Sequence, residues 1–138
     1  MLLGSFPDLV VADVARSVAF YRALLDLDVL IDHGWYAELG HAGRTHVAFV
    51  RTGHDSLPAR ASMPPTGVLV TFDVDDAAAA HLRAAAHGCQ VELDLTAELG
   101  QRHFMIRDPD HAIVDIVERI PLTHADLRRL AAYRRHST

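Results

Sequence analysis

The sequence predicts an α+β protein made of two β-α-β-β-β modules and a C-terminal helix. Three observations lead to this prediction. The plan of residues 9–31 is repeated at 69–93, strand-like apolar runs follow in each half, and a stretch rich in Gly, Pro and Ser separates the halves. We expect paired, curved mixed sheets around a cleft, each with one helix on its convex side. The expected organisation is a single domain at 1–120, with modules at about 5–51 and 67–119, a connector at 52–66 and a helical extension at 121–138.

The first module opens with a β-type apolar run, Leu9 to Val11, that leads to Asp13. An Asp at this position can accept hydrogen bonds from the free N–H groups of a following helix. Apolar residues at helical spacing predict that helix over 14–25. Strands are expected in the segments VLIDHGWYAEL and RTHVAFV, with turns at Gly34 and at Gly40 to Gly43.

The second module repeats this order from Val68 to Phe72 onward, with Asp75 or Asp76 as the helix cap and an Ala-rich helix over 76–87. The segments QVELDL, RHFMIRD and AIVDIV are expected to be strands. The sequence Asp108-Pro109-Asp110 is typical of a turn between the last two.

The C-terminal extension begins at Thr123, which can cap a helix with an apolar stripe at Leu127, Leu130 and Ala131. We expect its four Arg to form a solvated face. The helix is expected to cover the sheet of its own domain or of a dimer partner, and not to bind a membrane or nucleic acid.

Two segments resemble the vicinal oxygen chelate superfamily, which includes glyoxalase I, extradiol dioxygenases, fosfomycin-resistance enzymes and bleomycin-resistance proteins. They are DVARSVAFYRALLDLDV near the start and FMIRDPDHAIVDIVE near the end. The resemblance covers about residues 5–119. It implies the two-module fold and, because most short members are homodimers, a homodimer. It leaves the function open, because this fold hosts several chemistries and some pure binders.

The metal-dependent members hold a divalent ion through one residue on the first strand and one on the last strand of each module. The usual set is His or Gln on the first strands and Glu or His on the last. By resemblance these positions fall on Phe6 (or Pro7), Ala48, Leu69 (or Val68) and Asp115. Three of the four are apolar, and a lone carboxylate does not hold a divalent ion with useful affinity. The resemblance therefore implies a site without metal or cofactor.

Two alternatives keep chemistry at Asp115 open. His46 lies two residues before Ala48 and so on the same strand face, while His103 lies on the strand beside Asp115. The two His and Asp115 could form an unorthodox metal triad. In the second alternative Asp115 or a nearby His acts as a general base without metal, and Asp115 is the leading catalytic candidate.

Two positions depart from the glycines that are common in the superfamily. Asp26 follows the first helix and His111 lies in the turn before the last strand. Asp and His tolerate the left-handed backbone region better than bulkier residues, so we expect both turns to survive with some strain.

The charge distribution has two interpretations, a solvated acidic surface that aids solubility and an attraction for a cationic ligand. Residues 121–138 carry four Arg and one Asp, a charge of +3, so the net charge of −5 leaves −8 on residues 1–120. An acidic body argues against nucleic acid as a partner and attracts small cations. The chain has no apolar run long enough to span a membrane and no basic, cleavable start, so we expect a cytoplasmic protein.

Aromatic, basic and acidic residues on the expected strands are the candidates for lining the cleft. Trp35 and Tyr36 adjoin on one strand, so one of them should face the cleft and the other the helix side. In binding members of the superfamily, aromatic side chains on the cleft walls stack on planar ligands; the alternative is that both rings pack in the cores. The full candidate set is Phe6, Trp35, Tyr36, His46, Phe49, Arg102, His103, Met105 and Asp115.

The leading interpretation is a metal-free, dimeric binder of a small, cationic or aromatic molecule, similar to the bleomycin-resistance proteins and suited to drug sequestration. The first alternative is a lyase, isomerase or dioxygenase-like enzyme that uses an atypical metal site or acid–base catalysis through Asp115. The second is a degenerate member that acts as an interaction or structural protein.

Overall fold

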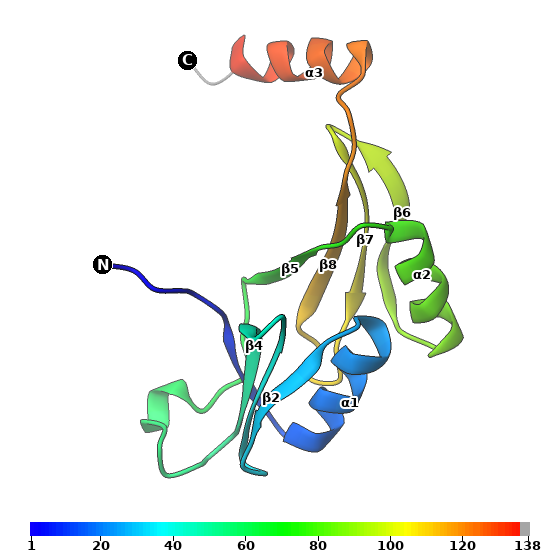
Figure 1. Cartoon of the computed structure of the whole chain (residues 1–138). Helices are drawn as coiled ribbons and strands as arrows, with labels where there is room; N and C mark the ends of the chain where they lie inside the picture. Colours follow the sequence, from blue (N-terminus) through cyan, green and yellow to red (C-terminus); the bar gives the residue numbers. More distant parts are fainter. Residues whose placement is uncertain (136–138) are drawn as a thin grey trace. The chain divides into compact units, whose positions relative to one another are not determined.

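The computed structural model of the chain describes residues 1–135 and contains two four-stranded mixed sheets and three α-helices (Figure 1). This confirms the predicted α+β class. No helix among these residues has both the length and the apolar character needed to cross a membrane. The elements are β1 Asp8–Val11, α1 Val14–Leu24, β2 Asp28–Asp32, β3 Tyr36–His41, β4 Arg44–Arg51, a 3₁₀ helix Ala59–Ala61, β5 Leu69–Asp73, α2 Ala77–Ala86, β6 Val91–Glu98, β7 Gln101–Arg107, β8 Ile113–Arg119 and α3 His124–Arg135.

The two sheets have the same topology, which confirms the repeat seen in the sequence. The strand order is β1-β4-β3-β2 in the first sheet and β5-β8-β7-β6 in the second. In the first sheet β1 runs parallel to β4, with Asp8 opposite Ala48, and β3 runs antiparallel to both β2 and β4. Helix α1 packs on β3 and β4, and α2 packs on β6.

The chain divides into two compact units that do not coincide with the two modules. The first unit is Met1–Val70 with Arg107–Ile113, and the second is Thr71–Ile106 with the chain from Val114 onward. The turn between β7 and β8 therefore belongs to the same unit as α1. The connector belongs to the first unit and contains the 3₁₀ helix.

The predicted helix caps are confirmed. Asp13 accepts a hydrogen bond from the N–H of Arg16 (3.1 Å), and Asp76 accepts one from the N–H of Ala79 (2.9 Å). Thr123 caps α3 through a reciprocal pair of hydrogen bonds, because its hydroxyl accepts from the Asp126 N–H while the Asp126 carboxylate accepts from the Thr123 N–H.

Three turn predictions have different outcomes. His111 does adopt a left-handed conformation, with φ +67°. Asp26 is not among the described residues with positive φ, because α1 ends at Leu24 and its C-terminal capping residue, Leu25, is extended (φ −124°), so no left-handed residue is needed after it. Gly40 lies inside β3 and not in the turn, and a Cβ on it would lie 1.9 Å from the Arg44 carbonyl oxygen.

Two tight hairpin turns carry a non-glycine residue in the left-handed region. They are Ala42-Gly43 between β3 and β4, with φ +50° and +74°, and Leu99-Gly100 between β6 and β7, with φ +50° and +81°. Positive φ at both central positions is the type I′ geometry, which matches the twist of the flanking strands. The sequence cue was weak, because Asn or Asp normally fills the first of these positions.

The core of the first sheet is organised around Tyr21 of α1, which is fully buried. Its ring lies 5.0 Å from that of Phe49 on β4, and its hydroxyl donates a hydrogen bond to Asp108 Oδ2 (2.8 Å). The other oxygen of Asp108 accepts hydrogen bonds from the N–H groups of Asp110 and Ala112. Burial, with the adjacent Asp108 carboxylate, raises the pKa of Tyr21 well above its ordinary value, so the phenol remains a proton donor.

We expect Tyr21→Phe to lower the free energy of unfolding by about 1–3 kcal/mol, because it leaves a buried carboxylate oxygen of Asp108 without its donor. Urea unfolding followed by circular dichroism measures this change. Tyr133→Phe on α3 is the matched control. The Tyr133 ring is exposed, so removal of its hydroxyl should change the free energy of unfolding by less than about 0.5 kcal/mol. Equal effects of the two substitutions would contradict the role given to the Tyr21–Asp108 contact.

Candidate functional site

Helix α2 packs on one face of the second sheet. On β7 the Phe104 ring meets His81 of α2 edge-on, with centroids 5.1 Å apart, and Phe104 is fully buried. Because side chains alternate along a strand, Phe104 and Ile106 face α2, while His103 and Met105 face the opposite side of the sheet. The candidate site in this unit is this second face.

His103 and Asp115 form a buried pair on that face. Nδ1 of His103 lies 3.0 Å from Oδ1 of Asp115, and each residue is 7% exposed. On the other side of the ring, Nε2 lies 3.7 Å from Oε1 of Glu98, near the end of β6. The polar partner of Asp115 within its apolar strand is thus a histidine on the neighbouring strand.

Arg102 lies apart from this pair. Its guanidinium donates to both oxygens of Glu118 (3.1 and 3.3 Å), and Glu118 accepts a hydrogen bond from the N–H of Ala77, the first residue of α2. Arg102 therefore faces the helix side of the sheet. The grouping of Arg102 with His103 in one site was wrong, because adjacent strand residues point to opposite faces.

A second polar cluster lies on the first sheet, on the face opposite α1. Glu38 accepts hydrogen bonds from the hydroxyls of Tyr36 (2.7 Å) and Thr45 (2.6 Å). Partial burial and the charge of Glu38 raise the pKa of Asp8 on β1. Burial, followed by the hydrogen bond to Glu38 and the charges of Glu38 and Asp8, raises the pKa of Tyr36. These four residues form the Glu38 cluster.

Sequence reasoning found Tyr36 but missed Asp8, Glu38 and Thr45. The signal for Glu38 was present, because in YAEL the buried Ala37 and Leu39 alternate with Tyr36 and Glu38. Asp8 could be found only through the parallel pairing of β1 with β4, which places it opposite Ala48. That pairing is not readable from local sequence.

Trp35 and Phe49 do not lie on this face. Trp35 precedes β3 in a bend and stacks on His54 of the connector, with ring centroids 3.8 Å apart and planes within 1°. The expectation that Trp35 and Tyr36 share a strand was therefore wrong. Phe49 has no exposed surface and packs against Tyr21, so its ring belongs to the helix-side core.

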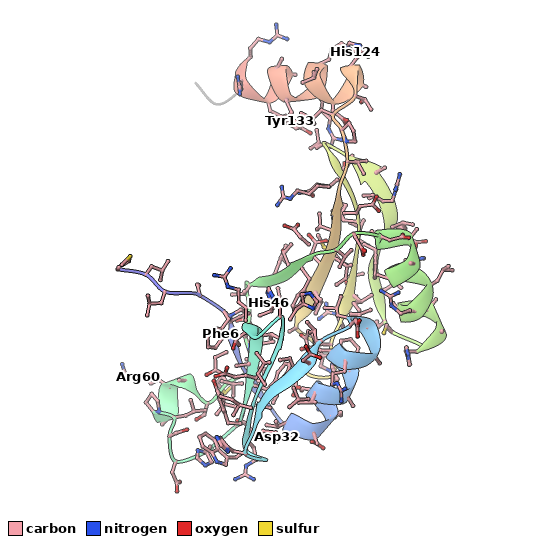
Figure 2. All side chains as sticks on the ribbon, in the orientation of Figure 1. Phe6, Asp32, His46, Arg60, His124 and Tyr133 are labelled. Atoms are coloured by element: carbon pink, nitrogen blue, oxygen red, sulfur yellow. The ribbon has the colours of Figure 1, made fainter. Side chains whose placement is uncertain are left out.

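Phe6 and His46 lie together in the first unit (Figure 2). Both line a groove of about 700 Å³, with the Ala42-Gly43 turn, Arg44, Thr45 and residues 3–5. Phe6 is 41% exposed and precedes β1. Met105 is half-buried on the His103 face of the second sheet.

The residues at the four positions of a superfamily metal site do not fit a divalent ion. Phe6, Ala48 and Leu69 offer hydrocarbon only, and Asp115 is occupied by His103. Among residues 1–135, no group of three or more His, Cys, Asp or Glu side chains is arranged to hold a metal. His46 lies in the first unit and His103 and Asp115 in the second, so neither unit contains the whole triad considered from the sequence.

Comparison with known proteins agrees with the two-module fold. The profile of the family described as "Glyoxalase/Bleomycin resistance protein/Dioxygenase superfamily" matches residues 5–116. No curated protein matches the chain significantly.

Several solved structures are similar to the chain in fold. The hypothetical protein SA1046 from S. aureus is 20% identical with a TM-score of 0.70, over 86% of this chain and 94% of its own. TioX from Micromonospora sp. ML1 is 21% identical with a TM-score of 0.67, over 85% and 100%. A lactoylglutathione lyase from Agrobacterium tumefaciens is 20% identical with a TM-score of 0.65, over 86% and 95%. At these identities the likeness concerns the fold alone.

We expect Asp115→Ala to lower the free energy of unfolding by about 1–3 kcal/mol, because it leaves the buried Nδ1 of His103 without a partner. The matched control is Asp94→Ala. Asp94 makes a similar 2.8 Å contact with His81, but its side chain is 83% exposed, so its loss should leave the free energy of unfolding nearly unchanged. Denaturant unfolding of both variants is the measurement. A neutral or stabilising Asp115→Ala would contradict the structural role of the pair.

Proposed function

The chain belongs to the Glyoxalase/Bleomycin resistance protein/Dioxygenase superfamily, and from this premise we propose that it binds a small, cationic, aromatic molecule without a metal ion. In this proposal the protein sequesters its ligand, for instance a drug, and does not transform it. Pairing of two chains into a homodimer is part of the proposal, as in most short members of the superfamily.

The observation that supports a cationic ligand is the position of the carboxylates. Each sheet carries a pair of acidic residues on or beside its face opposite the helix: Asp8 and Glu38 in the first, Glu98 and Asp115 in the second. Acidic groups that share one face raise the local concentration of cations. The half-buried Met105 beside His103, and the Tyr36 ring beside Glu38, add apolar surface for a planar ligand.

Fluorescence titration with proflavine, a planar aromatic cation, tests this proposal. We expect micromolar binding by the wild type, and about tenfold weaker binding in Glu38→Gln and in Asp115→Asn, since a hydrogen bond to a charged group contributes about 1.5–3 kcal/mol. Elemental analysis of the untagged protein, made in parallel, should give no stoichiometric metal.

Asp94→Asn is the matched control for these substitutions. It removes one exposed carboxylate that pairs with His81 of α2, on the helix side of the second sheet, and should leave proflavine binding unchanged. Equal affinity for proflavine and for the anion 8-anilinonaphthalene sulfonate would count against a cation site. Stoichiometric metal whose removal abolishes binding would overturn the metal-free proposal.

One observation favours an alternative function, metal-free acid–base catalysis. A carboxylate that orients a histidine leaves the far nitrogen of the ring free to take up a proton, and His103 has Asp115 at Nδ1 in this arrangement. A buried His–Asp pair in a binding face is therefore also a candidate for a general base.

The hemithioacetal of methylglyoxal and glutathione is a suitable assay substrate for this alternative, because its isomerisation requires transfer of one proton. If the alternative holds, turnover should persist in the presence of a chelator and fall by about 10²–10⁴-fold in His103→Gln. Turnover that His103→Gln leaves unchanged would exclude His103 as the base.

A further inference from the structure

Helix α3 is attached to the β6–β7 hairpin, which carries Glu98 at its tip. The Leu99 N–H donates to the Asp126 carboxylate (3.0 Å), and the Ile120 N–H donates to the Gly100 carbonyl (2.9 Å). A Cβ on Gly100 would lie 3.1 Å from the Leu122 side chain, so the hairpin and the segment before α3 approach closely. The start of the helix is thereby held at a fixed place on the hairpin.

Arg129, one turn into α3, reaches the same hairpin tip. Its Nη1 donates to Glu98 Oε2 (2.9 Å), and its Nε donates to the Tyr133 hydroxyl (2.7 Å). The second oxygen of Glu98, Oε1, is the one that lies 3.7 Å from His103 Nε2. Asp115, His103, Glu98 and Arg129 therefore form a row of polar groups, in which His103 and Glu98 are 3.7 Å apart and the other neighbours are hydrogen-bonded.

The hydrogen-bonding roles along this chain leave two acceptors side by side. Ionised Asp115 can only accept, so a proton lies on His103 Nδ1, and when the ring is neutral its Nε2 carries a lone pair. Glu98 Oε1 is a second acceptor at 3.7 Å, too far for a hydrogen bond between the two. Two convergent acceptors match a group with several N–H donors and a positive charge.

We propose that His103 Nε2 and Glu98 Oε1 together accept an ammonium or amidinium group of the ligand, and that Arg129 of α3 is the positioning residue that holds Glu98 beside His103. This rests on the proposed function and names the ligand group that the second sheet recognises.

The physical reason for a positioning role is the freedom of the Glu98 side chain. Its carboxylate is 39% exposed, and without a partner it would sample several rotamers in solvent. The bond to Arg129 occupies one oxygen and leaves the other toward His103. The hydrogen bond and charge of Arg129 hold the pKa of Glu98 below its usual range, which keeps the group anionic.

The experiment follows the ring nitrogens of His103 by NMR in the full-length, isotope-labelled protein during titration with benzamidine, an aromatic amidinium. The neutral isostere benzamide is the control ligand. We expect benzamidine, and not benzamide, to shift the Nε2 signal of His103. Affinity should fall about tenfold in Glu98→Gln and about threefold to tenfold in Arg129→Ala.

Arg128→Ala is the matched control variant, because Arg128 is an exposed neighbour on the same helix. It should bind benzamidine like the wild type, and Arg129→Lys should recover part of the loss, since Lys keeps the charge but not the fork geometry. All variants are first checked for wild-type circular dichroism. A carboxyl-carbon titration should show the pKa of Glu98 rising in Arg129→Ala only.

Three results would overturn the inference. The first is an Nε2 that carries a proton at neutral pH without ligand, because His103 and Glu98 would then be an ion pair and not an acceptor pair. The second is equal benzamidine binding by Arg129→Ala and Arg128→Ala. The third is proflavine binding that depends on Glu38 and Asp115 while benzamidine has no effect on the His103 signals. This result would contradict only this inference and would still support the proposed function.

Discussion

The buried hydrogen bond from Tyr21 to Asp108 is the interaction on which the arrangement of the strands depends. It joins residues 87 positions apart and places the turn between β7 and β8 in the same unit as α1. Asp110 of that turn accepts a hydrogen bond from the Ala12 N–H (2.9 Å) and pairs with Arg16 at the start of α1. A turn held in this way sets the register of the strands it connects, and a slip of one residue would move every side chain of β8 to the other face. The pairing of His103 with Asp115 therefore also depends on contacts that the turn makes with residues 87 to 98 positions earlier in the chain.

The repeat and the caps were predictable because they rest on local chemistry. Asp13, Asp76 and Thr123 each precede a helix and satisfy its first N–H groups, and this needs no tertiary contact. The faces of the strands were less accessible. Because side chains alternate along a strand, Arg102 and His103 point to opposite faces of the sheet, but the sequence does not tell which of them faces α2. The contact of Phe104 with His81 of α2 assigns the faces. Phe49 was misplaced for the same reason.

The Glu38 cluster shows a different limit of sequence reasoning. Tyr36, Glu38 and Thr45 come together through a hairpin and are close in sequence, whereas Asp8 arrives through a parallel pairing with β4 that spans 40 residues. The net charge of residues 1–120 showed that acidic residues are in excess. It did not show that several of their carboxylates lie on the sheet face opposite the helix. The conformation of Asp26 was also beyond the sequence, because it depends on how α1 ends at Leu25.

Stability alone does not account for a carboxylate at position 115. Burial of Asp115 and His103 requires removal of both groups from water, and a buried polar pair of this kind is often matched or exceeded in stability by apolar residues of similar volume. Strand β8 offers such residues on both sides, Val114 and Ile116, each fully buried. The pair also lies on the face opposite α2, with its outer nitrogen directed to Glu98 and not into the helix-side core. We infer that this polar pair, which core packing does not require and which lies beside a further acidic side chain, serves the ligand recognition proposed above.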